Sequence, residues 1–124
     1  MFKLETDPRY WWPVTILLPD PQQSGQFVEH QCEAEFRWLS SREYEAWLNQ
    51  VVKSNIDDAQ AMCGVWSGGA AVCVGFRGVA QADGTPLESS AASLERLLVN
   101  DALLARRFAK AFFDSRAKAA EKNS

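Results

Sequence analysis

The chain has 124 residues, of which 47% are apolar and 23% charged, and its formal net charge is −3. This length suits one domain with one packed core, so we expect a single domain over residues 1–124. The negative charge argues against nucleic acid as a partner, because such binding draws its affinity from many Lys and Arg contacts to phosphates.

Neither a membrane span nor an export signal is predicted. The longest apolar stretch, residues 68–76, is far shorter than the about 20 residues that a spanning helix needs. The opening residues, MFKLETDPRYWW, lack the apolar core and the small-residue cleavage site of a signal peptide. We therefore expect a cytoplasmic protein whose three cysteines, Cys32, Cys63 and Cys73, stay reduced.

An arm and a β-hairpin are expected first. Residues 1–11 predict a loosely held N-terminal arm. Apolar residues alternate over residues 12–18 and again over residues 27–38, which predicts two strands with one dry and one wet face. Because of Pro13, the first strand should either lie at an edge of the sheet or begin after Pro13. Because an isolated hairpin is marginally stable in water, helices should cover its dry face.

Four or so α-helices are expected to follow, each begun by a capping residue. A capping box at Ser40-Ser41-Arg42-Glu43 predicts the first start, and the other caps are Asp57 or Asp58, Ser89 or Ser90, and Asn100 or Asp101. The glycines in Ser67-Gly68-Gly69 predict a break. The apolar run over residues 70–76 fits a buried strand or a buried helix. Residues 117–124 predict a disordered tail. The fold class is thus α+β, an antiparallel hairpin packed against helices.

His30 and Cys32 raise the question of chemistry, because they lie on one face of the second predicted strand. A zinc site with Cys63 and Cys73 is disfavoured, since no two cysteines have the close spacing that structural zinc sites use. A Cys-His nucleophilic pair is disfavoured too, because the two residues stand about 7 Å apart along a strand. The sequence therefore predicts a protein that is not an enzyme and that holds no metal or cofactor.

Two groups of residues are candidates for binding another protein. Tyr10 and Trp11 extend the aromatic content beyond what the core needs, and aromatic residues are enriched at interfaces; packing in the core or at a sheet edge is the alternative. Arg106, Arg107 and Lys110 give the last helix a basic face, which could dock an acidic partner or simply be solvated.

Three segments occur in a characteristic order: Phe36-Arg37-Trp38-Leu39-Ser40, then Gly75-Phe76-Arg77-Gly78-Val79, then Asp83-Gly84-Thr85-Pro86-Leu87. With the leucine-paired helix and the Ala111-Phe112 pair that follow, they resemble the phage tail assembly chaperone family of long-tailed bacterial viruses and prophages. The resemblance runs from about residue 36 to residue 113. Its order of elements favours a helix over residues 70–76.

The resemblance implies a function without catalysis. Such a chaperone binds the tape-measure protein in the cytoplasm of the bacterial host, keeps it soluble and helps to recruit tail-tube subunits. A structural phage component, such as a tail-completion or head–tail connector protein, is the first alternative. A small enzyme that uses His30 and Cys32 is the second. Self-association is left open by the sequence.

Overall fold

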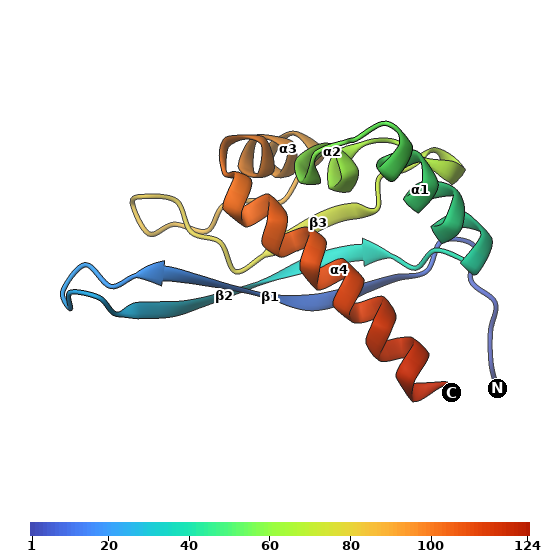
Figure 1. The fold of residues 1–124 in the computed structure, drawn as a ribbon, viewed down its shortest axis with the longest axis horizontal. Coiled ribbons are helices and arrows are strands. Elements are labelled where there is room, and N and C mark those ends of the chain that lie inside the picture. The colour runs from blue at the N-terminus through green and yellow to red at the C-terminus, as the bar shows by residue number, and fades with distance from the viewer.

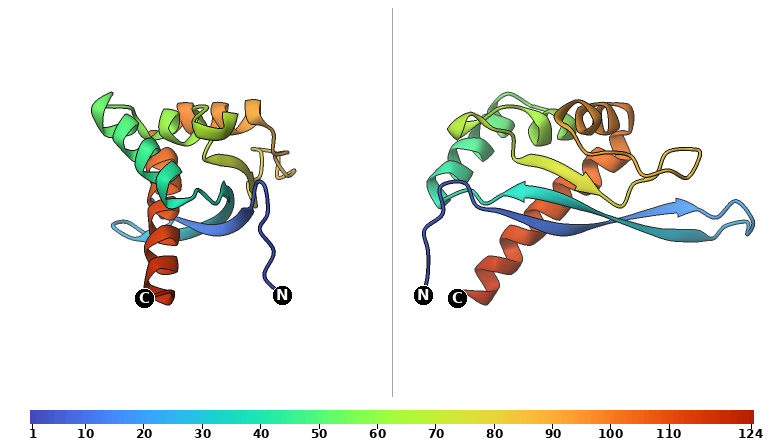
Figure 2. Two further views of the ribbon diagram at one scale, coloured as in Figure 1. Left: turned by 90° about the vertical axis from the view of Figure 1, so that its right-hand side faces the viewer. Right: turned by 180° about the vertical axis from the view of Figure 1, so that it is seen from behind.

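The computed structural model describes all residues, 1–124, and its elements form an α+β fold. In chain order they are β1 (Arg9–Pro19), β2 (Phe27–Arg37), α1 (Ser41–Lys53), α2 (Asp58–Cys63), the 3₁₀ turn η1 (Ser67–Gly69), β3 (Cys73–Arg77), α3 (Ala91–Asn100) and α4 (Ala102–Lys122). Helix α4 crosses one face of the sheet, while α1, α2 and α3 gather on the side where β3 lies (Figures 1 and 2). None of the helices combines the length and the apolar character needed to cross a membrane.

The three strands form an antiparallel sheet in the order β1-β2-β3. The β1–β2 hairpin is paired over its whole length, from Arg9 opposite Arg37 to Pro19 opposite Phe27. Strand β3 pairs with β2 only between Glu33 and Phe36. The end of the hairpin therefore projects beyond the rest of the sheet, as Figure 1 shows. The expected hairpin is confirmed, but β1 begins at Arg9, so the expected arm is too long by three residues.

The face of the hairpin that carries the even-numbered residues is the dry one. Val14, Ala34 and Phe36 are buried on it, and α4 packs against β1 from that side. The rings of Phe36 and Phe112, from β2 and α4, lie 5.3 Å apart with an interplanar angle of 64°. Helix α4 thus covers the apolar face that an isolated hairpin would expose to water. Toward its tip the face becomes wet, because His30 is exposed there.

The helix starts agree with the expected capping residues. At α1 the capping box is complete: Glu43 N donates to Ser40 Oγ at 3.1 Å, and Ser40 N donates to Glu43 Oε1 at 2.9 Å. Asp57, Ser90 and Asp101 cap α2, α3 and α4 through the same side-chain-to-backbone contact. Each cap satisfies a backbone N–H that the first helical turn would otherwise leave free.

The expected disordered tail is wrong, because α4 continues to Lys122. Residues 116–122 are Arg, Ala, Lys and Glu, which are all strong helix formers. A basic residue in the last turn also complements the negative end of the helix dipole.

The helix expected over residues 70–76 is wrong as well. The break at the glycines is confirmed, since Gly68 and Gly69 have φ values of 82° and 74°. After this turn the chain becomes extended and β3 runs from Cys73 to Arg77. Val72 and Phe76 are buried. A short apolar run with no periodicity suits such a strand, which is covered on both sides and so needs no wet face.

Candidate protein-binding site

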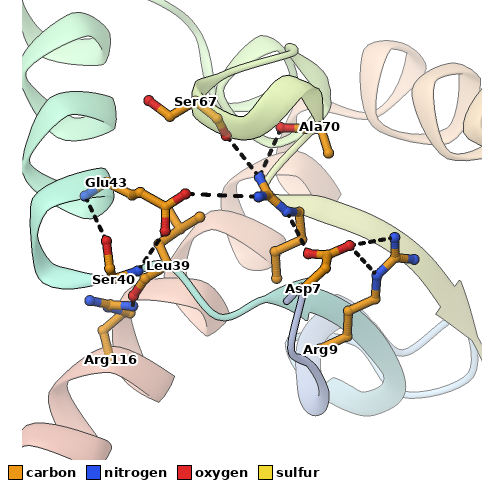
Figure 3. A network of polar contacts seen from close by, with 9 residues as sticks. Asp7, Arg9, Leu39, Ser40, Glu43, Ser67, Ala70 and Arg116 are labelled. Atoms are coloured by element: carbon orange, nitrogen blue, oxygen red, sulfur yellow. Dashed lines mark hydrogen bonds and ion pairs between the residues drawn. The ribbon is translucent and has the colours of Figure 1, made fainter. Parts of the chain in front are cut away.

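A buried arginine joins three segments at the end of β2. Arg37 is 7% exposed, and its Nη1 donates to the carbonyls of Ser67 and Ala70, each at 3.2 Å. Its Nε donates to Asp7 Oδ1 at 3.0 Å, and Glu43 Oε2 lies 4.0 Å from its Nη2. Figure 3 shows how Asp7, Glu43, Ser67 and Ala70 surround this position. The alternation over residues 27–38 puts Arg37 on the opposite face from Phe36, among charged residues, so sequence reasoning missed its burial.

The charges of this network are matched within the protein. The hydrogen bond from Arg37, helped by one from Arg9, holds the pKa of Asp7 below its ordinary value. Asp7 Oδ2 is 3.0 Å from Arg9 Nη2. A network in which donors and acceptors already satisfy one another positions the chain segments it joins, and it leaves no group free to react. We therefore assign it a structural role.

Tyr10, the first predicted binding residue, belongs to the core. Its hydroxyl lies 2.7 Å from Ser115 Oγ on α4, and its ring is 5.8 Å from that of Phe36 and 6.0 Å from that of Trp38. Burial raises the pKa of the Tyr10 hydroxyl. The alternative of packing against the core is thus the one that the structure shows, and Tyr10 is partly buried there.

Trp11 lies on the other face of the sheet. Residues alternate along a strand, so Trp11 points away from α4 where Tyr10 points toward it. The guanidinium of Arg77 stands 4.0 Å above the Trp11 ring, and it also forms an ion pair with Glu33 at 2.8 Å. Trp11 is half-buried in this arrangement. It is therefore an edge-packed residue on the face of the sheet that turns away from α4 and its basic residues.

The three basic residues of α4 do not act as one face. Arg107 turns toward the sheet, where its Nε donates to the carbonyl of Thr15 at 2.6 Å. Arg106 and Lys110 are exposed one helical turn apart. Lys110 is paired with Asp114 at 2.7 Å. Of the predicted basic set, Arg106 alone is exposed and without a hydrogen bond or ion pair to another side chain.

Arg106 borders a hollow of about 510 Å³ between the start of α2 and the junction of α3 with α4. Leu98 and Ala105 line it and are buried, whereas Val99, which also lines it, is 63% exposed. Asp58 stands on the α2 side. Apolar and polar residues therefore line the hollow together, with opposite charges contributed by different helices.

This hollow was missed by sequence reasoning, although one signal was present. Leu97, Leu98 and Val99 are three apolar residues in succession, which is more than one buried helix face uses. Leu98 is fully buried and Val99 turns outward. An apolar residue on the outer side of α3 could have indicated that a site lies there. It could not have shown that α2 forms the other side of the hollow.

The thiols are not activated. Burial raises the pKa of Cys32 and of Cys73, and it raises the pKa of Cys63 to about 11. Such thiols are protonated at neutral pH and are poor nucleophiles. His30 is exposed on the projecting part of the hairpin. No cluster of His, Cys, Asp and Glu in the structure could hold a metal ion.

One part of the sequence that carries the resemblance, residues 78–87, forms a tight loop after β3. Gly78 and Gly84 have φ values of 83° and 89°, a region that favours glycine. Leu87 N donates to Val79 O at 2.8 Å, which closes the loop. The glycines of this segment are thus explained by the geometry of the loop. No protein-family model, no curated protein and no solved structure matches this chain.

Proposed function

We propose that this protein is a non-enzymatic phage or prophage tail assembly chaperone, which holds an amphipathic helical segment of the tape-measure protein in the hollow between α2 and the α3–α4 junction. The observation that carries the proposal is one exposed apolar residue in the lining: Val99 is 63% exposed beside the buried Leu98. A groove between helices receives the apolar side chains of a partner helix at helical spacing.

The charges beside the groove fit transient binding. Arg106 can pair with an acidic residue of the partner helix, and Asp58 with a basic one, since both border the hollow. Exposed ion pairs of this kind add orientation and speed of association more than affinity. A chaperone needs such a balance, because it must release its client when tail-tube subunits arrive. The chain would act in the cytoplasm of the bacterial host.

The test is co-expression with the tape-measure protein, followed by pull-down and light scattering. Val99→Lys places a charge in the groove without disturbing the core. We expect it to weaken binding by about tenfold or more, because the buried area of one valine is lost. Val65→Lys is the matched control, since Val65 is 72% exposed and lies outside the groove. Equal binding by the two variants, or a tape-measure protein that is soluble alone, would contradict the proposal.

A structural tail-completion or head–tail connector protein remains the second candidate. The projecting hairpin favours it, because Leu17 and Phe27 are 56% and 64% exposed near its tip. Exposed apolar residues on a projecting arm are suited to permanent contact with a neighbour. Mass spectrometry of purified particles separates the two functions: a structural component stays in the particle, and a chaperone is absent from it.

A further inference from the structure

The two outer edges of the sheet differ in how well they are protected. On β1, Thr15 O faces outward, since Arg107 of α4 bonds to it. Backbone groups alternate in direction along a strand, so Pro13 and Pro19 also face outward. Neither proline has an N–H to offer a further strand. The β1 edge is therefore closed to strand addition by prolines and by a side-chain cap.

The corresponding edge of β2 is open near the hairpin tip. Its pairing with β3 ends at Glu33, and the chain turns away at Gly78 beside Cys32. Arg37 N donates to Val72 O, on the β3 side, so alternation directs the backbone groups of Glu29 and Gln31 to that same side. No hydrogen bond joins these outward groups to another part of the chain. A row of free donors and acceptors is a template for another strand.

A second segment of the same chain lacks partners. Met1, Phe2 and Leu4 are 119%, 85% and 91% exposed. Phe2 and Leu4 are two residues apart, so they share one face of an extended chain. The base of the segment is held by Asp7 through its bond to Arg37. Residues 1–6 are therefore a strand-length segment that carries exposed apolar residues, is held near Asp7 and is unpaired in the structure.

We propose that residues 1–6 of one copy add as a strand to the free β2 edge of a second copy. With antiparallel pairing and Lys3 opposite Glu29, opposite charges meet on the wet face. The same register brings Leu4 beside the half-buried Val28 on the apolar face. Charge and hydrophobicity thus select one register for the added strand.

The added strand must come from another copy. In this register Glu5 stands opposite Phe27, which pairs with Pro19 at the far end of β1. That position lies ten residues, about 33 Å, along the strand from Arg9. Glu5 is only four residues before Arg9 and reaches about 14 Å at most. Figure 1 shows the N-terminal segment leaving the sheet at the end opposite the hairpin tip.

The experiment measures mass against concentration by analytical ultracentrifugation. The wild-type chain should self-associate. Lys3→Glu and Glu29→Lys should each weaken association by about three- to tenfold, because each places like charges opposite each other. An equimolar mixture of the two variants should associate again, since each arm then meets an edge of opposite charge. A monomeric wild type, or a mixture no better than its components, would overturn the proposal.

A second pair of variants tests the backbone contact. Glu29→Pro removes an outward N–H that the hairpin itself does not use, so the chain should remain folded by circular dichroism. Glu29→Gln removes the charge alone. We expect the proline variant to associate at least tenfold more weakly than the glutamine variant. If the two variants associate equally, the interface is a different one and the proposed strand addition is refuted. A Leu4→Asp variant that associates like the wild type would refute it too.

Discussion

Replacing Arg37 by methionine tests whether the buried network holds the fold together. Methionine keeps most of the alkyl length of the side chain and removes its charge and all its donors. The carbonyls of Ser67 and Ala70 then lose the guanidinium that bonds both at 3.2 Å. The N-terminal segment loses the hydrogen bond that fixes Asp7. The substitution should loosen the attachment of η1 and of this segment to the sheet together.

The expected loss follows from the contacts. A hydrogen bond that involves a charged group contributes about 1.5–3 kcal/mol. Three such bonds are lost, but Asp7 and Ser67 are exposed and water can replace part of their bonds. We therefore expect the free energy of unfolding to fall by about 2–4 kcal/mol, out of the roughly 5–15 kcal/mol typical of a domain. The melting temperature should fall by about 6–20 °C.

The assay is urea unfolding followed by tryptophan fluorescence and circular dichroism. Arg77→Met is the matched control, because Arg77 is also ion-paired but its side chain is 54% exposed. It should leave the urea midpoint almost unchanged. Equal shifts for the two variants, or a loss below about 1 kcal/mol for Arg37→Met, would refute the claim that burial makes this arginine important.

The same variant should change the acid sensitivity of the fold. Arg37 is the main cause of the lowered pKa of Asp7, whose ordinary value is 3.8. A carboxyl with a lowered pKa stabilises the folded state above its unfolded pKa, and this stability is lost as the pH falls through the folded value. The wild type should therefore lose stability below about pH 4 more steeply than Arg37→Met does. Parallel acid-unfolding profiles would contradict this assignment.

Three further predictions follow from local geometry. Gly68→Ala should lower the urea midpoint more than Gly69→Ala, because both have positive φ but a Cβ at Gly68 would lie 2.8 Å from Arg37 Nη2 and one at Gly69 would meet nothing. Modification of Cys63 by a thiol reagent should keep rising up to about pH 11, and a plateau near pH 9 would contradict its burial. Tyr10→Phe and Ser115→Ala should show a coupling of about 0.5–1.5 kcal/mol in a double-mutant cycle, as expected for one partly buried hydrogen bond.

The fold could be predicted where a local signal was sufficient. The alternation over residues 27–38 identified β2, and the capping box at Ser40 identified the start of α1. Both depend on neighbours within four residues along the chain. The run over residues 70–76 lacked such a signal, and the helix favoured there by resemblance was a strand. Its conformation is set by pairing with β2, which is some 40 residues away in sequence.

The predicted binding residues were dispersed by contacts that a sequence does not show. Tyr10 bonds to Ser115, which is 105 residues away, and Arg107 bonds to Thr15, which is 92 residues away. Their residue types were suited to an interface, but the topology directs them inward. Arg106 kept its predicted exposure. The groove that it borders could not be predicted, because its two sides come from helices separated by some 40 residues.

The packing of α4 on β1 has a consequence for the time at which the protein can fold. The first strand leaves the ribosome early, but the helix that covers its apolar face follows every other element of the chain. At about 5–20 residues per second, the 105 residues between Tyr10 and Ser115 take roughly 5–20 s to synthesise. During that interval the dry face of the hairpin has no native cover. The apolar face of the nascent hairpin therefore stays exposed, or is covered by another molecule, until α4 has emerged. The hairpin gains its native packing only when α4 docks on it.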